Sequence, residues 1–186
     1  MNCGVMTPED GLCGHCRVAY RKAWTVGSYH GSLGVLIRRI KFDAARAGLK
    51  EAAMLMAGRL PSLPSNVRIV PIPTITRHIR LRGFDHTDRI ARELSRVKNV
   101  PMVRQLKRKH ISVQVGASKS LREKQARDAF ELGGTIDPEL IYLLVDDVVT
   151  TGASMREAAK ILRLGGAQTI WAVCLAREAL DDRDDI

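Results

Sequence analysis

Aromatic side chains are scarce in this sequence, because only 4% of its 186 residues are Phe, Trp or Tyr. A surface that stacks the bases of single-stranded nucleic acid needs several of them, so the composition disfavours one. No apolar run approaches the roughly 20 residues that cross a bilayer. The N-terminus also lacks the basic and then apolar pattern of a signal peptide. We therefore expect a cytoplasmic protein without a membrane span.

Cysteines are equally few, and three of the four lie within the first 16 residues. Cys13 and Cys16 form a Cys-x-x-Cys knuckle with Cys3 upstream, a spacing typical of zinc ligands. In a cytoplasmic protein such cysteines are metal ligands or free thiols rather than disulfides. Tetrahedral zinc needs one more ligand, which is expected from His15 or His30, or from a cysteine before Met1 if the start is shortened. A decayed site without zinc is the alternative.

Acidic residues are outnumbered: 20 Asp and Glu stand against 30 Lys and Arg, for a net charge of +10. Much of the excess lies between Arg77 and Arg127, which suits an anionic ligand or nucleic acid. Because stacking residues are few, we expect any binding of DNA to be weak and electrostatic.

Strand and helix patterns alternate along the chain, which predicts an α/β fold with a Rossmann-like parallel sheet flanked by helices. The predicted strands cover residues 67–72, 100–106, 141–145 and 169–176. Helices are predicted around 33–40, 43–60, 85–97 and 155–164. Residues 1–26 are expected to be loop-like and to form a degenerate or partial zinc-ribbon-like segment, ahead of one α/β domain over residues 27–186.

The most informative stretch, residues 143–154, reads Leu-Leu-Val-Asp-Asp-Val-Val-Thr-Thr-Gly-Ala-Ser. A predicted strand stops at Asp146 and Asp147, at the edge of a parallel sheet where ligands bind. Ser154 and Glu157 then predict a capping box for the next helix. The N–H groups of a helix N-terminus favour a phosphate, and paired carboxylates suit a sugar diol or a divalent cation. The motif therefore predicts a sugar phosphate site.

This motif resembles the phosphoribosyl diphosphate (PRPP) signature of type I phosphoribosyltransferases. Residues 27–186 are thereby identified as a phosphoribosyltransferase-like domain. The resemblance implies that Asp146 and Asp147, the catalytic candidates, hold the ribose 2′- and 3′-hydroxyls. It also implies that the turn cradles the 5′-phosphate and that Mg²⁺ bridges diphosphate and ribose oxygens. The implied PRPP-binding residues are Asp146, Asp147, Val148, Val149, Thr150, Thr151, Gly152, Ala153 and Ser154.

Two further stretches resemble one particular family that carries this signature. Residues 69–73 read Ile-Val-Pro-Ile-Pro, and residues 80–86 read Arg-Leu-Arg-Gly-Phe-Asp-His. Both are similar to the ComF/GntX family, in which Asn and Gln stand where this chain has Asp85 and His86. Asp85 still predicts a helix start. In the basic loop predicted at 77–83, Arg80 and Arg82 are expected to bind diphosphate, because a guanidinium pairs phosphate oxygens bidentately.

A third stretch fits the same family, since Gln114, Arg122 and Phe130 have its Gln-x7-Arg-x7-Phe spacing. In type I phosphoribosyltransferases the matching region is a hood that closes over PRPP and excludes water. Histidines such as His78 and His86 are candidate general bases, although lone histidines in basic loops are usually solvated.

The resemblance implies a reaction in which a nitrogen nucleophile displaces diphosphate from ribose C1 of PRPP. No motif identifies the acceptor. The family is associated with DNA uptake in competence, and a homodimer or a partner from the competence machinery stays open. One alternative is a non-catalytic module that senses PRPP or binds DNA. A weaker one is nucleobase salvage, which normally supplies an aromatic lid for the base.

Overall fold

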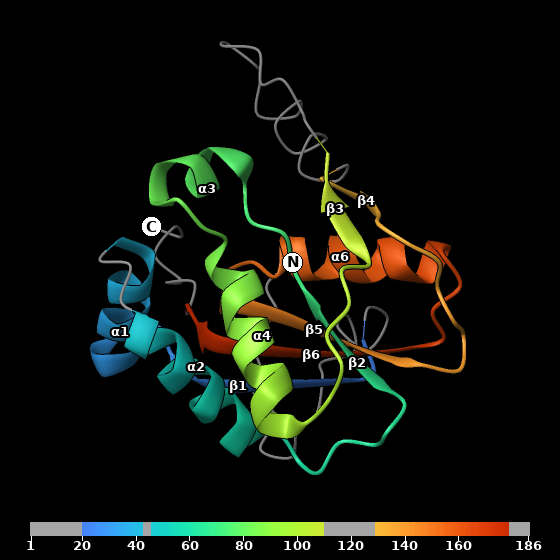
Figure 1. Cartoon of the computed structure of the whole chain (residues 1–186), viewed down its shortest axis with the longest axis horizontal. Helices are drawn as coiled ribbons and strands as arrows, with labels where there is room; N and C mark the ends of the chain where they lie inside the picture. The colour runs from blue at the N-terminus through green and yellow to red at the C-terminus, as the bar shows by residue number, and fades with distance from the viewer. Residues whose placement is uncertain (1–19, 43–45, 110–128, 179–186) are drawn as a thin grey trace, which may run out of the picture.

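The computed structural model describes residues 20–42, 46–109 and 129–178, which build one parallel sheet flanked by helices (Figure 1). The elements in chain order are β1 (Lys22–Ser28), α1 (Gly31–Phe42), α2 (Arg46–Arg59), β2 (Val67–Pro71), α3 (Thr76–Arg82), α4 (His86–Lys98), β3 (Leu106–Arg108), β4 (Phe130–Leu132), β5 (Ile141–Val149), α6 (Ala153–Leu164) and β6 (Thr169–Arg177). The main sheet has the order β1-β6-β5-β2, with all neighbours parallel. The predicted α/β class is confirmed.

Strand β5 lies inside the sheet and carries core residues on both faces. Leu143 and Val145 pack in a cluster with α1, α2 and α4, whereas Tyr142 and Leu144 pack in a second cluster with α6. Helices therefore cover both faces, as Figure 1 shows. Because β2, β5 and β6 are parallel, their carboxyl ends meet at one edge of the sheet.

A two-stranded ribbon stands beside this edge, where β3 and β4 pair antiparallel. The backbone N–H of Lys109 donates to the carbonyl of Ala129 at 3.0 Å, so both flanks of residues 110–128 are held side by side. Phe130 is fully buried in the α6 cluster. Gln114 and Arg122 of the predicted hood lie outside the described residues.

Several predicted boundaries are wrong. Residues 22–26 belong to β1, not to a loop, because β1 pairs with β6 and buries Trp24. The predicted strand at 100–106 is reduced to a bridge between Met102 and Ile69, and β3 begins only at Leu106.

The predicted basic loop at 77–83 is helix α3, which ends at Gly83 in the left-handed conformation, with φ of 77°. It has no buried residue, so the sequence carries no apolar stripe that would reveal it. Within the described residues, no helix is long and apolar enough to cross a membrane.

Candidate functional site

The two acidic residues of the PRPP-like signature lie within β5, not after it. The strand continues to Val149, four residues beyond the predicted end at Val145. Successive side chains of a strand point to opposite faces, so Asp146 and Asp147 separate instead of standing together. Asp147 points toward the α1 and α4 side, as its contacts below establish.

Asp147 is 6% exposed and is held by two side chains from different helices. Its Oδ2 lies 2.5 Å from Nζ of Lys41, at the end of α1, and 3.0 Å from Nε2 of His86, at the start of α4. Its Oδ1 accepts the backbone N–H of Val148 at 2.8 Å. Three donors therefore surround one carboxylate.

The two neighbouring carboxylates have pKa values that are shifted in opposite directions. Burial alone would raise the pKa of Asp147, but the hydrogen bonds from His86 and Lys41 and the charge of Lys41 outweigh it and lower that pKa. The pKa of Asp146 is raised well above the ordinary value, first because its carboxylate is desolvated and then because the charge of Asp147 lies next to it. Ionisation is therefore favoured at Asp147 and disfavoured at Asp146. A cation bound beside Asp146 would favour its ionised form.

His86 extends the contacts of Asp147 toward α3. Its Nδ1 lies 3.3 Å from Nη1 of Arg82, and the Arg82 guanidinium stacks 5.3 Å from the ring centroid of Phe42. Arginine can only donate, so Nδ1 accepts and the ring proton sits on Nε2, facing Asp147. His86 is therefore a buried connecting residue, and the expectation of a solvated histidine is wrong.

The turn after β5 is open to solvent at the positions that would contact a phosphate. Thr150, Thr151 and Ser154 are exposed, while Gly152 is buried. Gly152 has φ of 71° and directly precedes α6 as its N-cap. The predicted capping box is wrong, because Gly152 has no capping side chain and Ser154 already lies in the helix.

Glu157, the other residue of the predicted capping box, is not exposed as Ser154 is. Glu157 is buried, and its Oε1 has no hydrogen-bond partner within the described parts of the chain. Within the described residues, Glu157 forms an ion pair with Lys160 at 3.6 Å. At the first turn of α6, the backbone N–H of Ala153 donates to the hydroxyl of Thr151 at 3.3 Å, so Glu157 does not cap this turn and Thr151 takes part in it.

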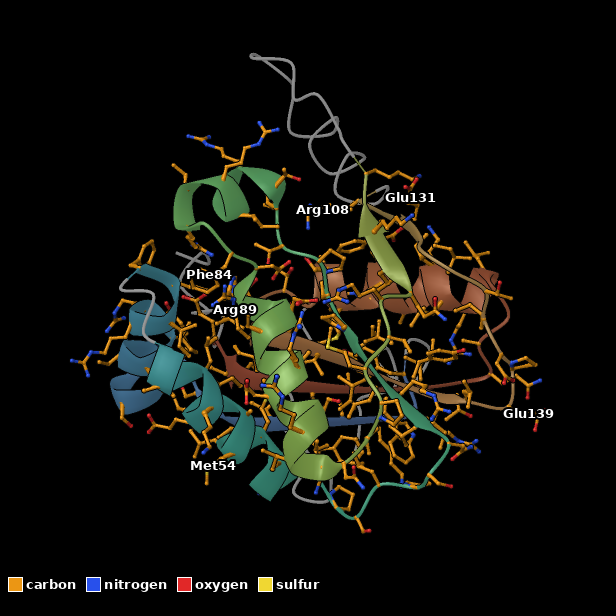
Figure 2. The ribbon with its side chains drawn as sticks, viewed as in Figure 1. Met54, Phe84, Arg89, Arg108, Glu131 and Glu139 are labelled. Carbon is orange, nitrogen blue, oxygen red and sulfur yellow. The ribbon has the colours of Figure 1, made fainter. Side chains whose placement is uncertain are left out.

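Arg108, in β3 (labelled in Figure 2), lies near enough to Asp146 for their charges to interact. Its Nη1 donates to the carbonyl of Pro73 at 3.2 Å, and its guanidinium stacks 5.2 Å from the ring centroid of Phe130. Burial lowers the pKa of Arg108, against the opposing charge of Asp146. An arginine remains charged under such conditions, so the site gains a fixed cation.

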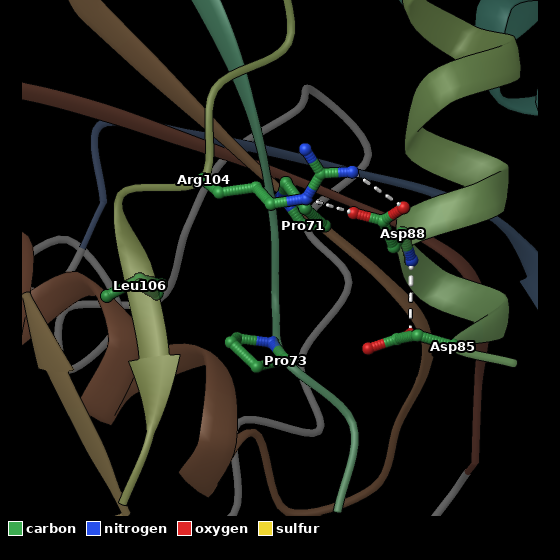
Figure 3. Close-up of a pocket in the computed structure, with 6 residues that line it drawn as sticks. All are labelled: Pro71, Pro73, Asp85, Asp88, Arg104 and Leu106. Carbon is green, nitrogen blue, oxygen red and sulfur yellow. Dashed lines mark hydrogen bonds and ion pairs between the residues drawn. The ribbon is translucent and has the colours of Figure 1, made fainter. Parts of the chain in front are cut away.

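A cavity of about 280 Å³ lies beside the end of β2 (Figure 3). It is lined by Pro71, Pro73, Asp85, Asp88, Arg104 and Leu106. The carboxylates are already bonded: Arg104 binds Asp88 through two hydrogen bonds of 2.7 and 3.1 Å, and Asp85 caps α4. The predicted cap at Asp85 is confirmed.

The structure thus brings some predicted site residues together and separates others. Arg80 is exposed on α3, whereas Arg82 is turned toward Phe42 and His86. Cys3, Cys13 and Cys16 lie outside the described residues. Lys41 was not predicted, because nothing in its local sequence points to a carboxylate so far along the chain. Arg108 was visible only as part of a basic run.

Mg²⁺ has few protein ligands available here. Within residues 20–42, 46–109 and 129–178 no group of three or more His, Cys, Asp or Glu is arranged to hold a metal ion. Mg²⁺ commonly takes one or two carboxylates and completes its shell with phosphates and water. Asp146 fits that role, since a cation beside it would compensate its charge.

Comparison with known proteins extends these observations, although no family model matches the sequence. The chain is 32% identical over 178 residues to competence protein F of Haemophilus influenzae, covering 89% of this chain and 78% of that protein. It is 31% identical over 192 residues to the DNA utilization protein YhgH of Salmonella typhi, covering 94% and 82%.

Two weaker similarities involve phosphoribosyl chemistry. A match of 48% over 56 residues to an orotate phosphoribosyltransferase of Sphingopyxis alaskensis covers 29% of this chain and 26% of that protein. The solved glutamine PRPP amidotransferase from B. subtilis is similar with a TM-score of 0.49 and 16% identity, over 69% of this chain and 26% of that one. The long sequence matches show the family: this chain belongs to the family of competence protein F and the DNA utilization protein YhgH.

Proposed function

We propose that this protein binds PRPP with Mg²⁺ at the carboxyl edge of β5 and transfers its phosphoribosyl group to a nitrogen acceptor. The observation that carries the proposal is the exposed turn at 150–154, directly beyond the half-buried Asp146 and at the N-terminus of α6. An anion is favoured there by the helix dipole and by free N–H groups.

Three groups then have separate roles in the proposal. Thr150, Thr151 and Ser154 bind the 5′-phosphate through hydroxyl and backbone N–H groups. Asp146 faces the ribose and the Mg²⁺ that accompanies the diphosphate. Arg108 faces the diphosphate, because its half-buried guanidinium presents a fixed charge beside Asp146.

The reaction would break the bond between ribose C1 and diphosphate and form one to the acceptor nitrogen, which loses a proton. The residues of this chain hold the sugar phosphate in place and stabilise charge on the departing diphosphate. Mg²⁺, when bound, supplies further charge neutralisation.

The test is calorimetric titration of the protein with PRPP, with and without Mg²⁺, followed by diphosphate release across a panel of bases and amines. Ligand at 100 times its dissociation constant should stabilise the fold by about 2.7 kcal/mol. Asp146→Asn should abolish binding, while Glu131→Gln, an exposed acid on β4, should leave it unchanged. Absence of binding by the wild type would overturn the proposal. Binding without diphosphate release on any acceptor would favour a PRPP sensor over an enzyme.

A further inference from the structure

We infer that residues 179–186, the acidic segment that follows β6, dock on a basic and apolar surface formed by α3 and the C-terminal end of α1, and shield it from other polyanions. We name this surface the α1–α3 face. Its members are all exposed side chains: Arg39, Phe42, Ile75, Arg77, Arg80 and Leu81. The inference does not depend on the proposed PRPP site, because both of its tests are made without PRPP.

The α1–α3 face carries charge of one sign. Its three arginines are exposed, and helices α1 and α3 contain no Asp or Glu. The two helices meet where the Arg82 guanidinium stacks 5.3 Å from the ring centroid of Phe42, and Figure 1 shows the end of α1 on the side of α3. A surface with charge of one sign attracts a partner of the opposite sign, so this face fits an anionic partner.

The same face exposes large apolar side chains. Leu81 is 76% exposed, Phe42 72% and Ile75 43%. Helix α3 has seven residues and none of them is buried. A helix of that length is marginal on its own and takes its stability from packing. Exposed apolar surface rimmed by polar residues is typical of an interaction site, so the partner should be apolar as well as acidic.

Residues 179–186 match both properties. They read Ala-Leu-Asp-Asp-Arg-Asp-Asp-Ile, with Leu180 and Ile186 on either side of the charged run. Nucleic acid would pair with the arginines but gains little from an aliphatic side chain such as Leu81, because bases stack on aromatic rings and guanidinium planes. Aspartates between two aliphatic residues can pair with the arginines and also cover Leu81 and Phe42.

The end of β6 brings the segment within reach of this face. The backbone N–H of Glu178 donates to the carbonyl of Val149 at 3.0 Å. Val149 lies two residues beyond Asp147 on β5, and Asp147 contacts Lys41 at the end of α1. An extended chain covers about 3.3 Å per residue, so the eight residues 179–186 span up to about 26 Å. A short tether holds a segment at an effective concentration on the order of millimolar.

Docking makes the segment a competitor within the chain for anions that use the same arginines. Exposed ion pairs are individually weak, so a partner with many phosphates can displace the segment. The segment therefore lowers the affinity of α3 for polyanions without abolishing it.

The first experiment detects the contact by cross-linking. Carbodiimide joins a carboxylate to an amine where the two touch, and Arg77→Lys with Arg80→Lys supplies amines on α3 while keeping its charge. Mass spectrometry should find bonds from aspartates in 181–185 to these two positions within one chain. They should be lost at 1 M salt, where the screening length is about 3 Å. Lys22, exposed at the opposite end of the sheet beside Trp171, is the control amine that should not react.

The apolar part of the contact is tested in the same assay. Leu81→Gln removes an exposed apolar side chain and should lower the cross-link yield about twofold or more. Leu164→Gln is the matched control, because Leu164 is 75% exposed on α6, and it should leave the yield unchanged.

The second experiment measures the shielding, by fluorescence anisotropy of a labelled DNA strand at physiological salt. Asp182→Asn with Asp184→Asn should tighten binding about threefold, because weak ion pairs to the arginines are lost. The control is Glu131→Gln with Glu139→Gln, two exposed acids labelled in Figure 2. Both double variants have a net charge of +12, since each loses two negative charges from a chain of +10. Only docking therefore distinguishes their affinities.

Three outcomes would overturn the inference. Absence of cross-links from residues 181–185 to α3 in folded protein would show that the segment does not dock there. Cross-links that join only two different chains would assign the face to a second copy. Equal DNA affinities of the two double variants would show that net charge alone, and not docking, weakens polyanion binding.

Discussion

Asp85, which lines the cavity beside β2, is joined to Thr74 by two hydrogen bonds. The hydroxyl of Thr74 donates to Oδ1 of Asp85 at 2.8 Å, and its backbone N–H donates to Oδ2 at 3.2 Å. Oδ1 also accepts the backbone N–H of Asp88, three residues on. One carboxylate thus starts α4 and ties that helix to the segment that follows β2.

This double role makes Asp85 a sensitive position. Asp85→Ala should lower the free energy of unfolding by about 1–2 kcal/mol, because it removes a helix cap and leaves Thr74 without its partner. Asp85→Asn keeps an acceptor for the cap and should cost less. Urea denaturation measures both, and equal stability of the two variants would contradict the capping role.

The raised pKa of Asp146 predicts how stability depends on pH. A carboxyl whose pKa is higher in the folded than in the unfolded protein stabilises the fold at low pH and loses that contribution as pH rises through the folded value. The loss therefore begins above about pH 3.9, the ordinary value for Asp. Asp146→Asn removes the loss, so it should raise the free energy of unfolding at pH 7.

Asp147 has the opposite effect on stability. Its lowered pKa gives a contribution that is present above about pH 4 and is lost as pH falls.

The prediction for Asp146 is measured by urea denaturation between pH 4 and pH 8, which should show the wild type losing stability relative to Asp146→Asn toward pH 8. Parallel curves for the two proteins would disprove the assignment of Asp146.

Gly152 is required by its backbone conformation. With φ of 71°, an alanine would cost about 1–2 kcal/mol, and its Cβ would lie 3.0 Å from Nη1 of Arg156. Gly152→Ala should therefore destabilise the protein and weaken PRPP binding by displacing the turn. Gly58→Ala is the matched control: Gly58 lies in α2 with nothing within 4 Å of the added Cβ, so alanine should be neutral or stabilising. Thermal melts and PRPP titrations of both variants make the comparison.

Zinc content tests the N-terminal cysteines. If Cys3, Cys13 and Cys16 hold zinc, protein purified without chelators should contain about one zinc per chain, as a tetrahedral site requires. Cys13→Ser should lose it, and Cys174→Ser should keep it, because Cys174 is buried beside Thr25 in the sheet. Elemental analysis of protein from zinc-replete medium decides, and a zinc-free wild type would support the decayed site.

DNA binding should be electrostatic and centred on α3, where Arg77 and Arg80 are exposed. Each phosphate contact to a single strand contributes about 0.7 to the slope of log affinity against log salt, so Arg77→Ala with Arg80→Ala should reduce the slope by about 1.4. Lys50→Ala, on the exposed side of α2, should change it less. Fluorescence anisotropy across a salt series measures the slopes. Saturating PRPP–Mg²⁺ should compete if Arg80 serves both anions, and tight binding that ignores salt would refute the model.

Local signals predicted the parts of the fold that local interactions build. Helix α4 was predicted because Asp85 caps it and because Ile90, Ala91 and Leu94 repeat at helical spacing, and all three are buried. Val97 shares that spacing but is 46% exposed. Helical periodicity identifies the apolar face of a helix but does not show how many residues of that face neighbouring elements bury.

The site was predicted only in part. Its signature motif is one contiguous stretch, whereas the residues that contact Asp147 are distant in the sequence. The motif predicted that Asp146 and the turn lie at a sheet edge. It also predicted Ser154 as the helix cap, whereas the N-cap of α6 is Gly152 in the left-handed conformation. Lys41 and His86 reach Asp147 only through the packing of α1 and α4 against β5. No local pattern records such a contact, so the separate environments of Asp146 and Asp147 required the structure.

The β3–β4 ribbon has a consequence for how this family can vary in length. Lys109 and Ala129 are hydrogen-bonded through their backbones, so the two ends of the chain on either side of residues 110–128 lie next to each other. The entropy of closing a chain between fixed ends grows only with the logarithm of its length, so doubling it costs about 0.6 kcal/mol. Changes in the number of residues between Lys109 and Ala129 should therefore cost the fold little.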